Sequence, residues 1–301
     1  MLTKKLALGL AAPLWLAAPA FAQDQDFSAV KIETQQLGDG LFMLIGSGGN
    51  IALSTGPDGS VLVDTQYAPL NGKILAAVRA AGGGDIKYVI NTHWHGDHTG
   101  GNEPLGKAGA VIIAHNNVLT RLSSDQVMGA PFNSTTPAAP AVARPVVTFP
   151  TRTTFHLNGN VVNVVHVENA HTDGDSIVHF TNANVIHTGD TYMKDVYPFI
   201  DVGSKGSIDG FIASSAAVLA RSDGSTKIIP GHGALANKAD MQRFHDMLVK
   251  VRGNLKTLID QGKTEDEVVA AKPTAEFDAG WGGGFMNAET FTRFAYQSLK
   301  Q

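Results

Sequence analysis

Four side chains of types that can bind a metal lie within six consecutive positions of this 301-residue chain. They are His93, His95, Asp97 and His98, in the run Thr-His-Trp-His-Gly-Asp-His-Thr. Ionisable side chains are costly to bury without partners, so a cluster this dense is typical of a metal site or a catalytic cleft. It follows an apolar strand predicted at 88–90, which places it on a loop between a strand and a helix. His93 and His95 point the same way on extended backbone, and Asp97 and His98 follow a glycine, which predicts one chelating pair for each of two metals.

Three further residues that can bind a metal lie on glycine-bearing loops beside predicted strands, each without a second candidate ligand next to it in the sequence. They are His171, Asp190 and His232. Loops at strand ends are held by a rigid scaffold, so we expect these side chains to complete the ligand sets. The chain has no cysteine, which excludes disulfides and thiolate ligands.

The predicted elements follow a similar plan in the two halves of the chain. In the first half we expect strands at 30–32, 41–45, 51–53, 61–63, 88–90 and 110–113 and a helix at 70–81. In the second half we expect strands at 153–157, 161–167, 176–180, 185–187 and 227–229 and helices at 207–219, 240–260 and 288–299. Each half supplies a sheet with helices on one side, which predicts an α/β fold, a four-layer αββα sandwich. The segment 123–144, rich in Ser, Thr, Pro and Ala, is expected to be a long surface loop.

Residues 1–22 have the pattern of a secretory signal peptide. Lys4 and Lys5 precede an apolar stretch that ends in Ala-Phe-Ala. The stretch is short for a membrane span and contains two prolines, so cleavage after Ala22 is favoured over a membrane anchor. We therefore expect one domain over residues 23–301 in an exported protein, periplasmic if the source is a Gram-negative bacterium.

The charge balance argues against a nucleic-acid partner. The chain has 23 basic and 27 acidic residues, and loss of Lys4 and Lys5 would leave 21 and 27, a formal charge of −6. No basic cluster is interleaved with aromatic residues. We expect a small-molecule substrate.

Five motifs in this order resemble those of the metallo-β-lactamase superfamily. That family has an Asp at the end of an early strand, then His-x-His-x-Asp-His, then a His, an Asp or Cys, and a final His. Asp64, the 93–98 cluster, His171, Asp190 and His232 match all five. The matches extend over nearly the whole of the expected mature chain.

The resemblance implies a centre with two metal ions, zinc in the first instance. Seven side chains would share the ligand roles: His93, His95 and His171 at the first metal, Asp97, His98 and His232 at the second, and Asp190 as a bridge between them. Asp64 would orient a ligand histidine from outside the ligand set. A hydroxide held between the metals would be the nucleophile, positioned by Asp97. Iron or manganese is also admissible, because oxygen ligands are harder than thiolate.

The resemblance also implies a hydrolase that opens a cyclic amide or ester. A β-lactam is the leading candidate substrate, since the protein is expected to be exported, as an antibiotic-degrading enzyme must be. Two features depart from the best-known zinc β-lactamases: Asp190 replaces a cysteine, and Met193 replaces a lysine, with Lys194 next to it. A lactonase, a glyoxalase II-like thioesterase, and a metal-binding or redox-relay protein with little hydrolysis stay open as alternatives.

The sequence also suggests which residues contact the substrate and which histidines do not bind metal. The expected substrate contacts are Trp94, Tyr192, Tyr197 and Lys194, with Phe199 and Trp281 also near the mouth of the site. Six histidines lack clustered partners and are expected to be structural or exposed: His115, His156, His166, His179, His187 and His245.

Overall fold

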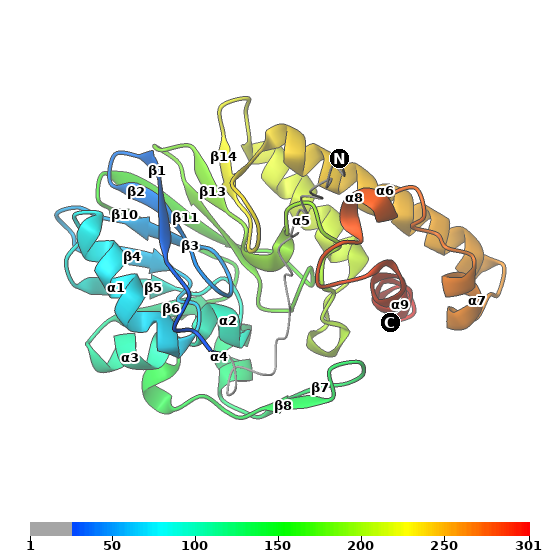
Figure 1. Ribbon diagram of the computed structural model, residues 1–301, viewed down its shortest axis with the longest axis horizontal. Coiled ribbons are helices and arrows are strands. Elements are labelled where there is room, and N and C mark those ends of the chain that lie inside the picture. The colour runs from blue at the N-terminus through cyan, green and yellow to red at the C-terminus, as the bar shows by residue number, and fades with distance from the viewer. Residues whose placement is uncertain (1–25) are drawn as a thin grey trace, which may run out of the picture.

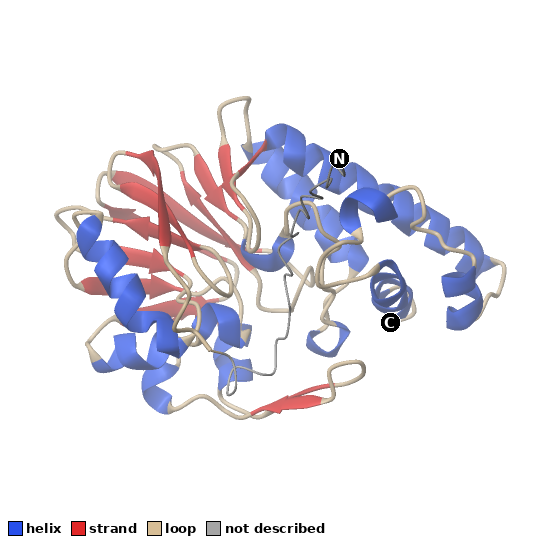
Figure 2. Ribbon diagram, viewed as in Figure 1, coloured by secondary structure: helices blue, strands red, loops and turns tan. Residues whose placement is uncertain are grey.

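Two β-sheets form the centre of the structure, and helices cover their outer faces (Figures 1 and 2). The computed structural model describes residues 26–301, so the predicted signal peptide lies outside the described residues. One sheet has seven strands in the order β1-β2-β3-β4-β5-β6-β9, and the other has six, β10 to β15, in sequence order. Strands β7 and β8 form a separate hairpin.

The first half of the chain builds the seven-stranded sheet and the helices beside it. Its strands are β1 (Glu33–Gly38), β2 (Leu41–Ile45), β3 (Ile51–Ser54), β4 (Ser60–Val63), β5 (Ile86–Ile90), β6 (Val111–His115) and β9 (Val147–Phe149). Its helices are α1 (Asn71–Ala80), α2 (Gly96–Thr99), α3 (Asn102–Lys107) and α4 (Asn116–Leu122). Strands β4, β5, β6 and β9 run parallel, so their carboxyl ends lie at one edge of the sheet.

The second half builds the six-stranded sheet and the longer helices. Its strands are β10 (Arg152–Leu157), β11 (Asn160–His166), β12 (Ser176–Phe180), β13 (Val185–His187), β14 (Lys227–Ile229) and β15 (Ala236–Asn237). Its helices are α5 (Ile208–Arg221), α6 (Lys238–Asp260), α7 (Glu265–Ala270), α8 (Asp278–Trp281) and α9 (Ala288–Ser298). Strands β13 and β14 are parallel neighbours.

The core between the two sheets joins the halves of the molecule. Met43 and Ile90 from the first sheet and Val164 and Ile229 from the second belong to one buried cluster. Complete burial of such a side chain stabilises the fold by about 1.5–3 kcal/mol. This packing holds the loops of one sheet in a fixed position relative to those of the other.

Two further clusters lie between each sheet and its helices. Ile74 of α1 packs in one cluster with Leu62 of the first sheet. Phe244 of α6 packs in the other with Ile186 of the second sheet. Helix, sheet, sheet and helix therefore follow one another, and the predicted four-layer αββα sandwich is confirmed.

Helix α6 shows how local sequence fixes an element. Its start is a capping box, in which the Asn237 side chain accepts hydrogen bonds from the backbone N–H groups of Ala239 and Asp240. Met241, Phe244 and further apolar residues recur at helical spacing and are buried. The periodicity that predicted a helix at 240–260 is the face that packs on the second sheet.

Two predictions for the first half of the chain need correction. Residues 30–32 are not a strand: β1 begins at Glu33, and the backbone oxygen of Val30 accepts a hydrogen bond from Lys73 Nζ at 2.6 Å instead of from a neighbouring strand. The segment 123–144 is not a plain loop, since it contains the hairpin of β7 (Gln126–Met128) and β8 (Ser134–Thr136).

Several short elements were not predicted. They include β9, β15, α2, α7 and α8, which have two to six residues each. Segments this short are too brief to show a hydrophobic period. Within residues 26–301, none of the helices combines the length and apolar character needed to cross a membrane.

Candidate metal centre

The carboxyl ends of four strands bring the predicted ligands together. Asp64 follows β4, His93 comes soon after β5, Asp190 follows β13 and His232 follows β14. Strands β4 and β5 are parallel, as are β13 and β14, so these residues leave their sheets at shared edges. His171 joins them from the loop between β11 and β12.

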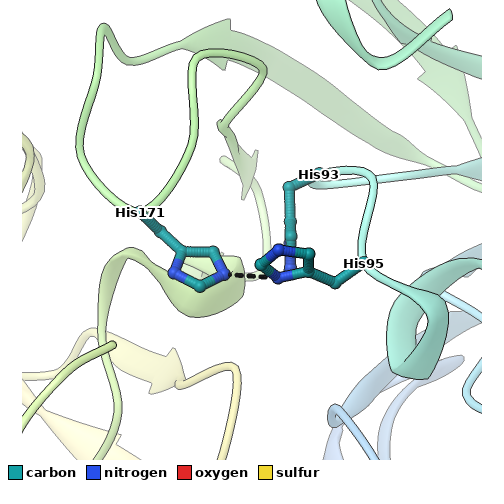
Figure 3. A group of neighbouring side chains, drawn as sticks. All are labelled: His93, His95 and His171. Atoms are coloured by element: carbon teal, nitrogen blue, oxygen red, sulfur yellow. Dashed lines mark hydrogen bonds between the residues drawn. The ribbon is translucent and has the colours of Figure 1, made fainter. Parts of the chain in front are cut away.

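His93, His95 and His171 form the first group, with one ring nitrogen of each within 4.8 Å of the others (Figure 3). The outer nitrogens of two of these rings have acceptors: His95 Nε2 donates to Asp201 Oδ2 at 3.0 Å, and His171 Nδ1 donates to the Phe199 backbone oxygen at 2.7 Å. The inner nitrogens, His95 Nδ1 and His171 Nε2, face each other at 2.8 Å. In these tautomers neither of the two nitrogens carries a hydrogen, so their lone pairs point toward each other.

His93 adds a third lone pair to this group. Its Nδ1 lies 3.1 Å from Thr92 Oγ1, which itself donates to Asp64 Oδ2 at 2.7 Å. His93 Nδ1 is therefore the donor, and its Nε2 is buried without a hydrogen-bond partner. Burial, with the charge of His98, holds the pKa of His93 well below its usual value.

The first group therefore fits a cation. Burial, then the neighbouring His95, lowers the pKa of His171 to about 4, so this imidazole is neutral at pH 7. Three imidazole nitrogens that converge without hydrogens are the donor set that zinc and similar divalent ions accept.

Asp97, His98 and His232 form the second group, also within 4.8 Å. His232 Nε2 lies 3.3 Å from Asp97 Oδ2 and 3.4 Å from His98 Nε2. The other nitrogen of His98, Nδ1, donates to Asp64 Oδ2 at 2.7 Å. Two imidazoles and one carboxylate again match a divalent ion.

Asp190 lies between the two groups. Its Oδ1 is 3.0 Å from His98 Nε2, and its Oδ2 is 3.4 Å from His232 Nε2 and 3.6 Å from His171 Nε2. Oδ1 is buried, and its approach to His98 does not meet hydrogen-bond geometry. The structure thus brings all seven predicted ligands together, and the assignment of each to a metal stays a prediction.

The carboxylates make the second group a site for positive charge. Burial alone would lower the pKa of His98, but the charges of Asp190, Asp97 and Asp64 raise it well above its usual value. For His232, burial is likewise outweighed by Asp190 and Asp97, which raise its pKa to about 10. Protons and metal ions therefore compete for these imidazoles.

Asp64 has the position expected of a residue that orients a ligand histidine. It is fully buried and accepts hydrogen bonds from Thr92 N, Thr92 Oγ1 and His98 Nδ1 at 2.7–2.8 Å. Its φ angle is 65°, a left-handed conformation that costs a non-glycine residue about 1–3 kcal/mol. Three hydrogen bonds to one carboxylate hold it there.

Two glycines leave room for the ligands. A Cβ on Gly231 would lie 2.0 Å from Asp190 Oδ1, and a Cβ on Gly49 would lie 2.1 Å from His98 Cε1. Real Cβ atoms do not approach other atoms so closely. The absence of side chains at these positions is a requirement of the centre.

Sequence reasoning did not identify Asp201 and left the role of Asp175 undecided. Asp175 accepts hydrogen bonds from His171 N, Thr172 N and Thr172 Oγ1, which shapes the loop that carries His171. Asp173, by contrast, pairs with Arg121 and contacts no ligand ring. Asp201 is 106 positions from its partner His95, so no local pattern could connect them.

The aromatic residues expected at the substrate mouth need correction. Tyr192 and Tyr197 have no exposed surface and belong to the core beneath the second sheet. Trp94 is 2% exposed, and its indole donates to Ser204 Oγ. Their apolar rings fill the interior, so the structure does not place them where a substrate would enter. Phe199 is next to the centre, with its ring 5.9 Å from that of His95.

Lys194 is also not available as predicted. Its Nζ lies 3.3 Å from Asp240 Oδ2 and donates to the Leu235 backbone oxygen at 3.1 Å. A lysine held in this way does not offer its charge to a substrate carboxylate. The accessible side of the centre is instead at His232 and Asp97, whose side chains are 33% and 16% exposed.

The six histidines expected to be structural are absent from the three ligand groups found among residues 26–301. His187 is buried and contacts the Asn50 backbone oxygen at 2.9 Å. His115 and His166 stack on each other with ring centroids 3.7 Å apart. These contacts are those of structural side chains.

Comparison with known families gives one match that spans more than half of the chain. Residues 44–232 match the model described as the metallo-β-lactamase superfamily. The matched range contains Asp64 and all seven predicted ligands.

One relative in sequence and two solved structures are similar to this chain, and they have different names. A hydroxyacylglutathione hydrolase from Polaromonas sp. strain JS666 is 27% identical over 217 residues, 68% of this chain and 71% of that protein. A metallo-β-lactamase from Pontibacter korlensis matches with a TM-score of 0.57 and 17% identity over 72% of this chain and 99% of that one. A double mutant of the sec-alkyl sulfatase PisA1 gives a TM-score of 0.67 and 18% identity over 89% of this chain and 50% of that one. At sequence identities this low, the similarity to the solved structures shows a shared fold and nothing about activity.

Proposed function

The chain belongs to the metallo-β-lactamase superfamily, and from this premise we propose that it is a hydrolase that uses two metal ions, zinc in the first instance, to cleave an activated carbonyl compound. The observation that carries the proposal is the convergence of three hydrogen-free imidazole nitrogens beside a second group of two imidazoles and a carboxylate, with Asp190 between them.

The protein's own residues divide the work of such a centre. Bound divalent ions would supply activated water and polarise the scissile carbonyl. Asp97 is the ligand carboxylate with exposed surface, so it is placed to orient water and to return a proton to the leaving group. Asp64 holds His98 in one orientation through the bond to Nδ1.

A thioester or ester is the substrate class that we favour. The curated relative at 27% identity is named for hydroxyacylglutathione, an acylated thiol. Lys194, the basic residue expected to hold the carboxylate of a β-lactam, is paired with Asp240 instead. Esters and thioesters need no such cation for their carbonyl to reach the centre.

A β-lactam is the second candidate, and the predicted signal peptide favours it. We also propose that the protein is exported, because residues 1–22 carry the pattern of a cleaved leader. An enzyme outside the cytoplasm meets antibiotics before they reach their targets. Mass spectrometry of the protein recovered from its source would test export, through an N-terminus at Gln23.

One parallel assay tests the proposal. The zinc-loaded protein, residues 23–301, is given a hydroxyacylglutathione thioester, a lactone and a chromogenic cephalosporin, each with and without a chelator. Chelator-sensitive thiol release is the expected result. Turnover of the cephalosporin alone would move the assignment to β-lactams. A protein that holds two metals and turns over none of the three would overturn hydrolysis and support a metal-binding or redox-relay role.

A further inference from the structure

We infer that Asp201 is a positioning residue that fixes the tautomer of His95. It thereby sets the affinity of the first group of predicted ligands, which includes His95, for a metal ion. The inference rests on the proposed metal centre and is independent of the substrate. Asp201 is not one of the seven predicted ligands and is not part of the five motifs, although it lies within the matched range 44–232.

Each oxygen of the Asp201 carboxylate accepts a hydrogen bond from a neighbouring residue. Its Oδ2 accepts from His95 Nε2 at 3.0 Å, and its Oδ1 accepts from Ser204 N at 3.1 Å. The backbone N–H of Asp201 donates to the His171 backbone oxygen at 3.1 Å. Asp201 is 4% exposed, so water does not compete for these bonds. One residue is thus tied to two of the three ligands of the first group.

This arrangement decides which nitrogen of His95 carries the hydrogen. Asp201 Oδ2 accepts from His95 Nε2 while Oδ1 accepts from Ser204 N, so the hydrogen of the imidazole belongs on His95 Nε2. His95 Nδ1 is then left with its lone pair facing His171 Nε2, where a metal ion needs it.

The segment around Asp201 also fixes the ring planes. The Phe199 ring lies nearly parallel to the His95 ring, at 14° and 5.9 Å. The Phe199 backbone oxygen takes the hydrogen of His171 Nδ1. Residues 199–201 therefore orient both His95 and His171 from outside the ligand set.

Asp64 shows the same device at the second group. Its buried carboxylate accepts the hydrogen of His98 Nδ1, so Nε2 is the nitrogen that faces His232 and Asp190. Asp64 follows β4, whereas Asp201 precedes the short helical turn Val202–Ser204, so the two carboxylates come from unrelated elements. Each metal group has one histidine whose tautomer is set by a buried carboxylate.

The variant Asp201→Asn tests the inference. An amide has one oxygen, yet both Ser204 N and His95 Nε2 donate to this side chain. When the amide oxygen faces Ser204, its NH2 group faces His95, and the imidazole must move its hydrogen to Nδ1. We expect the affinity for one of two zinc ions to fall about 10–100-fold, the usual effect of losing an outer partner of a metal-binding histidine. Chelator competition measures both affinities, and the absorption spectrum of the Co²⁺-loaded protein should change.

Asp173→Asn is the matched control. It removes the same charge close to His171, but Asp173 pairs with Arg121 and contacts no ligand ring. Both zinc affinities should stay within about threefold of those of the unmodified protein. An equal loss in both variants would attribute the effect to charge alone and overturn the inference.

A second readout needs no variant. ¹⁵N NMR of histidine-labelled, zinc-loaded protein should show the hydrogen of His95 on Nε2, and a hydrogen on Nδ1 would overturn the inference even if Asp201→Asn fails to fold. Two zinc ions bound with unchanged affinity by Asp201→Asn would overturn it as well, with the metal centre intact. An unmodified protein that binds no zinc would instead remove the centre itself.

Discussion

At the scale of single residues, Asp190 is the predicted ligand whose loss should matter most. Its two oxygens lie within 3.6 Å of nitrogens from both metal groups. Asp190→Ala should lower the metal content below two ions and reduce hydrolysis at least ~100-fold, more than the loss of an outer partner. Elemental analysis and the thioester assay measure the two effects. His179→Ala, which changes a histidine of β12 outside the ligand groups, should alter neither. Two metal ions retained by Asp190→Ala would refute the bridging assignment.

Gly231 offers a test that changes no ligand. A methyl group at this position would overlap Asp190 Oδ1, at 2.0 Å, so Gly231→Ala should displace the carboxylate and weaken metal binding without removing any donor. Titration with zinc in the presence of a chelator measures the loss. Gly253→Ala adds the same methyl group within α6, where nothing lies within 4 Å, and should stabilise the helix by roughly 0.5–1 kcal/mol. Equal zinc affinity in both variants would contradict the close contact.

The sequence revealed the residues that its local pattern marks and missed those defined by distant partners. The 93–98 cluster and the lone ligands at strand ends were identified because metal chemistry restricts the residue types. Asp201 was missed because an acidic residue after an apolar run is common on any surface. Tyr192 and Tyr197 were assigned to the substrate mouth because aromatic residues have the same sequence signature in a mouth and in a core.

At the scale of elements, the capping box of α6 is a feature of stability alone. Asn237→Ala removes the side-chain oxygen that accepts two backbone N–H groups, which should cost about 1 kcal/mol. Urea denaturation with the metal held at saturation measures the change, and the metal stoichiometry should stay the same. Loss of metal in this variant would show that the start of α6 also holds the loop of His232.

Elements were predicted where their pattern was long enough to read. Helices α5 and α6 have 14 and 23 residues, and their apolar periods placed them to within a few residues. The strands of the hairpin have three residues each, Gln-Val-Met in β7 and Ser-Thr-Thr in β8, and are too short to show the alternation of a strand. Its tip packs by tertiary contact, with the Phe132 ring 5.1 Å from that of Phe199 beside the metal centre. No local signal encodes such a contact.

At the scale of the whole molecule, the proposed metal centre would connect the two halves of the sandwich. Four of the predicted ligands precede residue 100 and three follow residue 170, on loops of different sheets. Metal that binds only the folded protein stabilises it, by about 4 kcal/mol when free metal is 1,000-fold above its Kd. Since each kcal/mol shifts the Tm of a domain this size by about 2–4 °C, removal of zinc should lower the Tm by roughly 10 °C. Thermal unfolding with and without a chelator measures the difference.

The difference in Tm between the zinc-loaded and the zinc-free protein should depend on pH. His98 and His232 determine whether it grows or shrinks as pH rises. In the metal-free protein, Asp190 and Asp97 raise the pKa of His232 to about 10, and the pKa of His98 is raised as well. A histidine whose pKa is raised by folding binds its proton more tightly in the folded state. Its stabilisation is therefore complete below the unfolded pKa of about 6.5 and is lost as pH rises toward 10.

Metal binding has the opposite dependence, because zinc must displace those protons and binds more tightly as they leave. The Tm difference between zinc-loaded and chelator-treated protein should therefore widen from pH 6.5 to pH 9. The low pKa values of His93 and His171 place their titration below pH 6.5, so these two histidines do not change the Tm difference between pH 6.5 and pH 9. Thermal unfolding of both forms at half-unit pH steps gives the comparison. A Tm difference that stays constant or narrows would show that His98 and His232 do not carry the protons that zinc displaces.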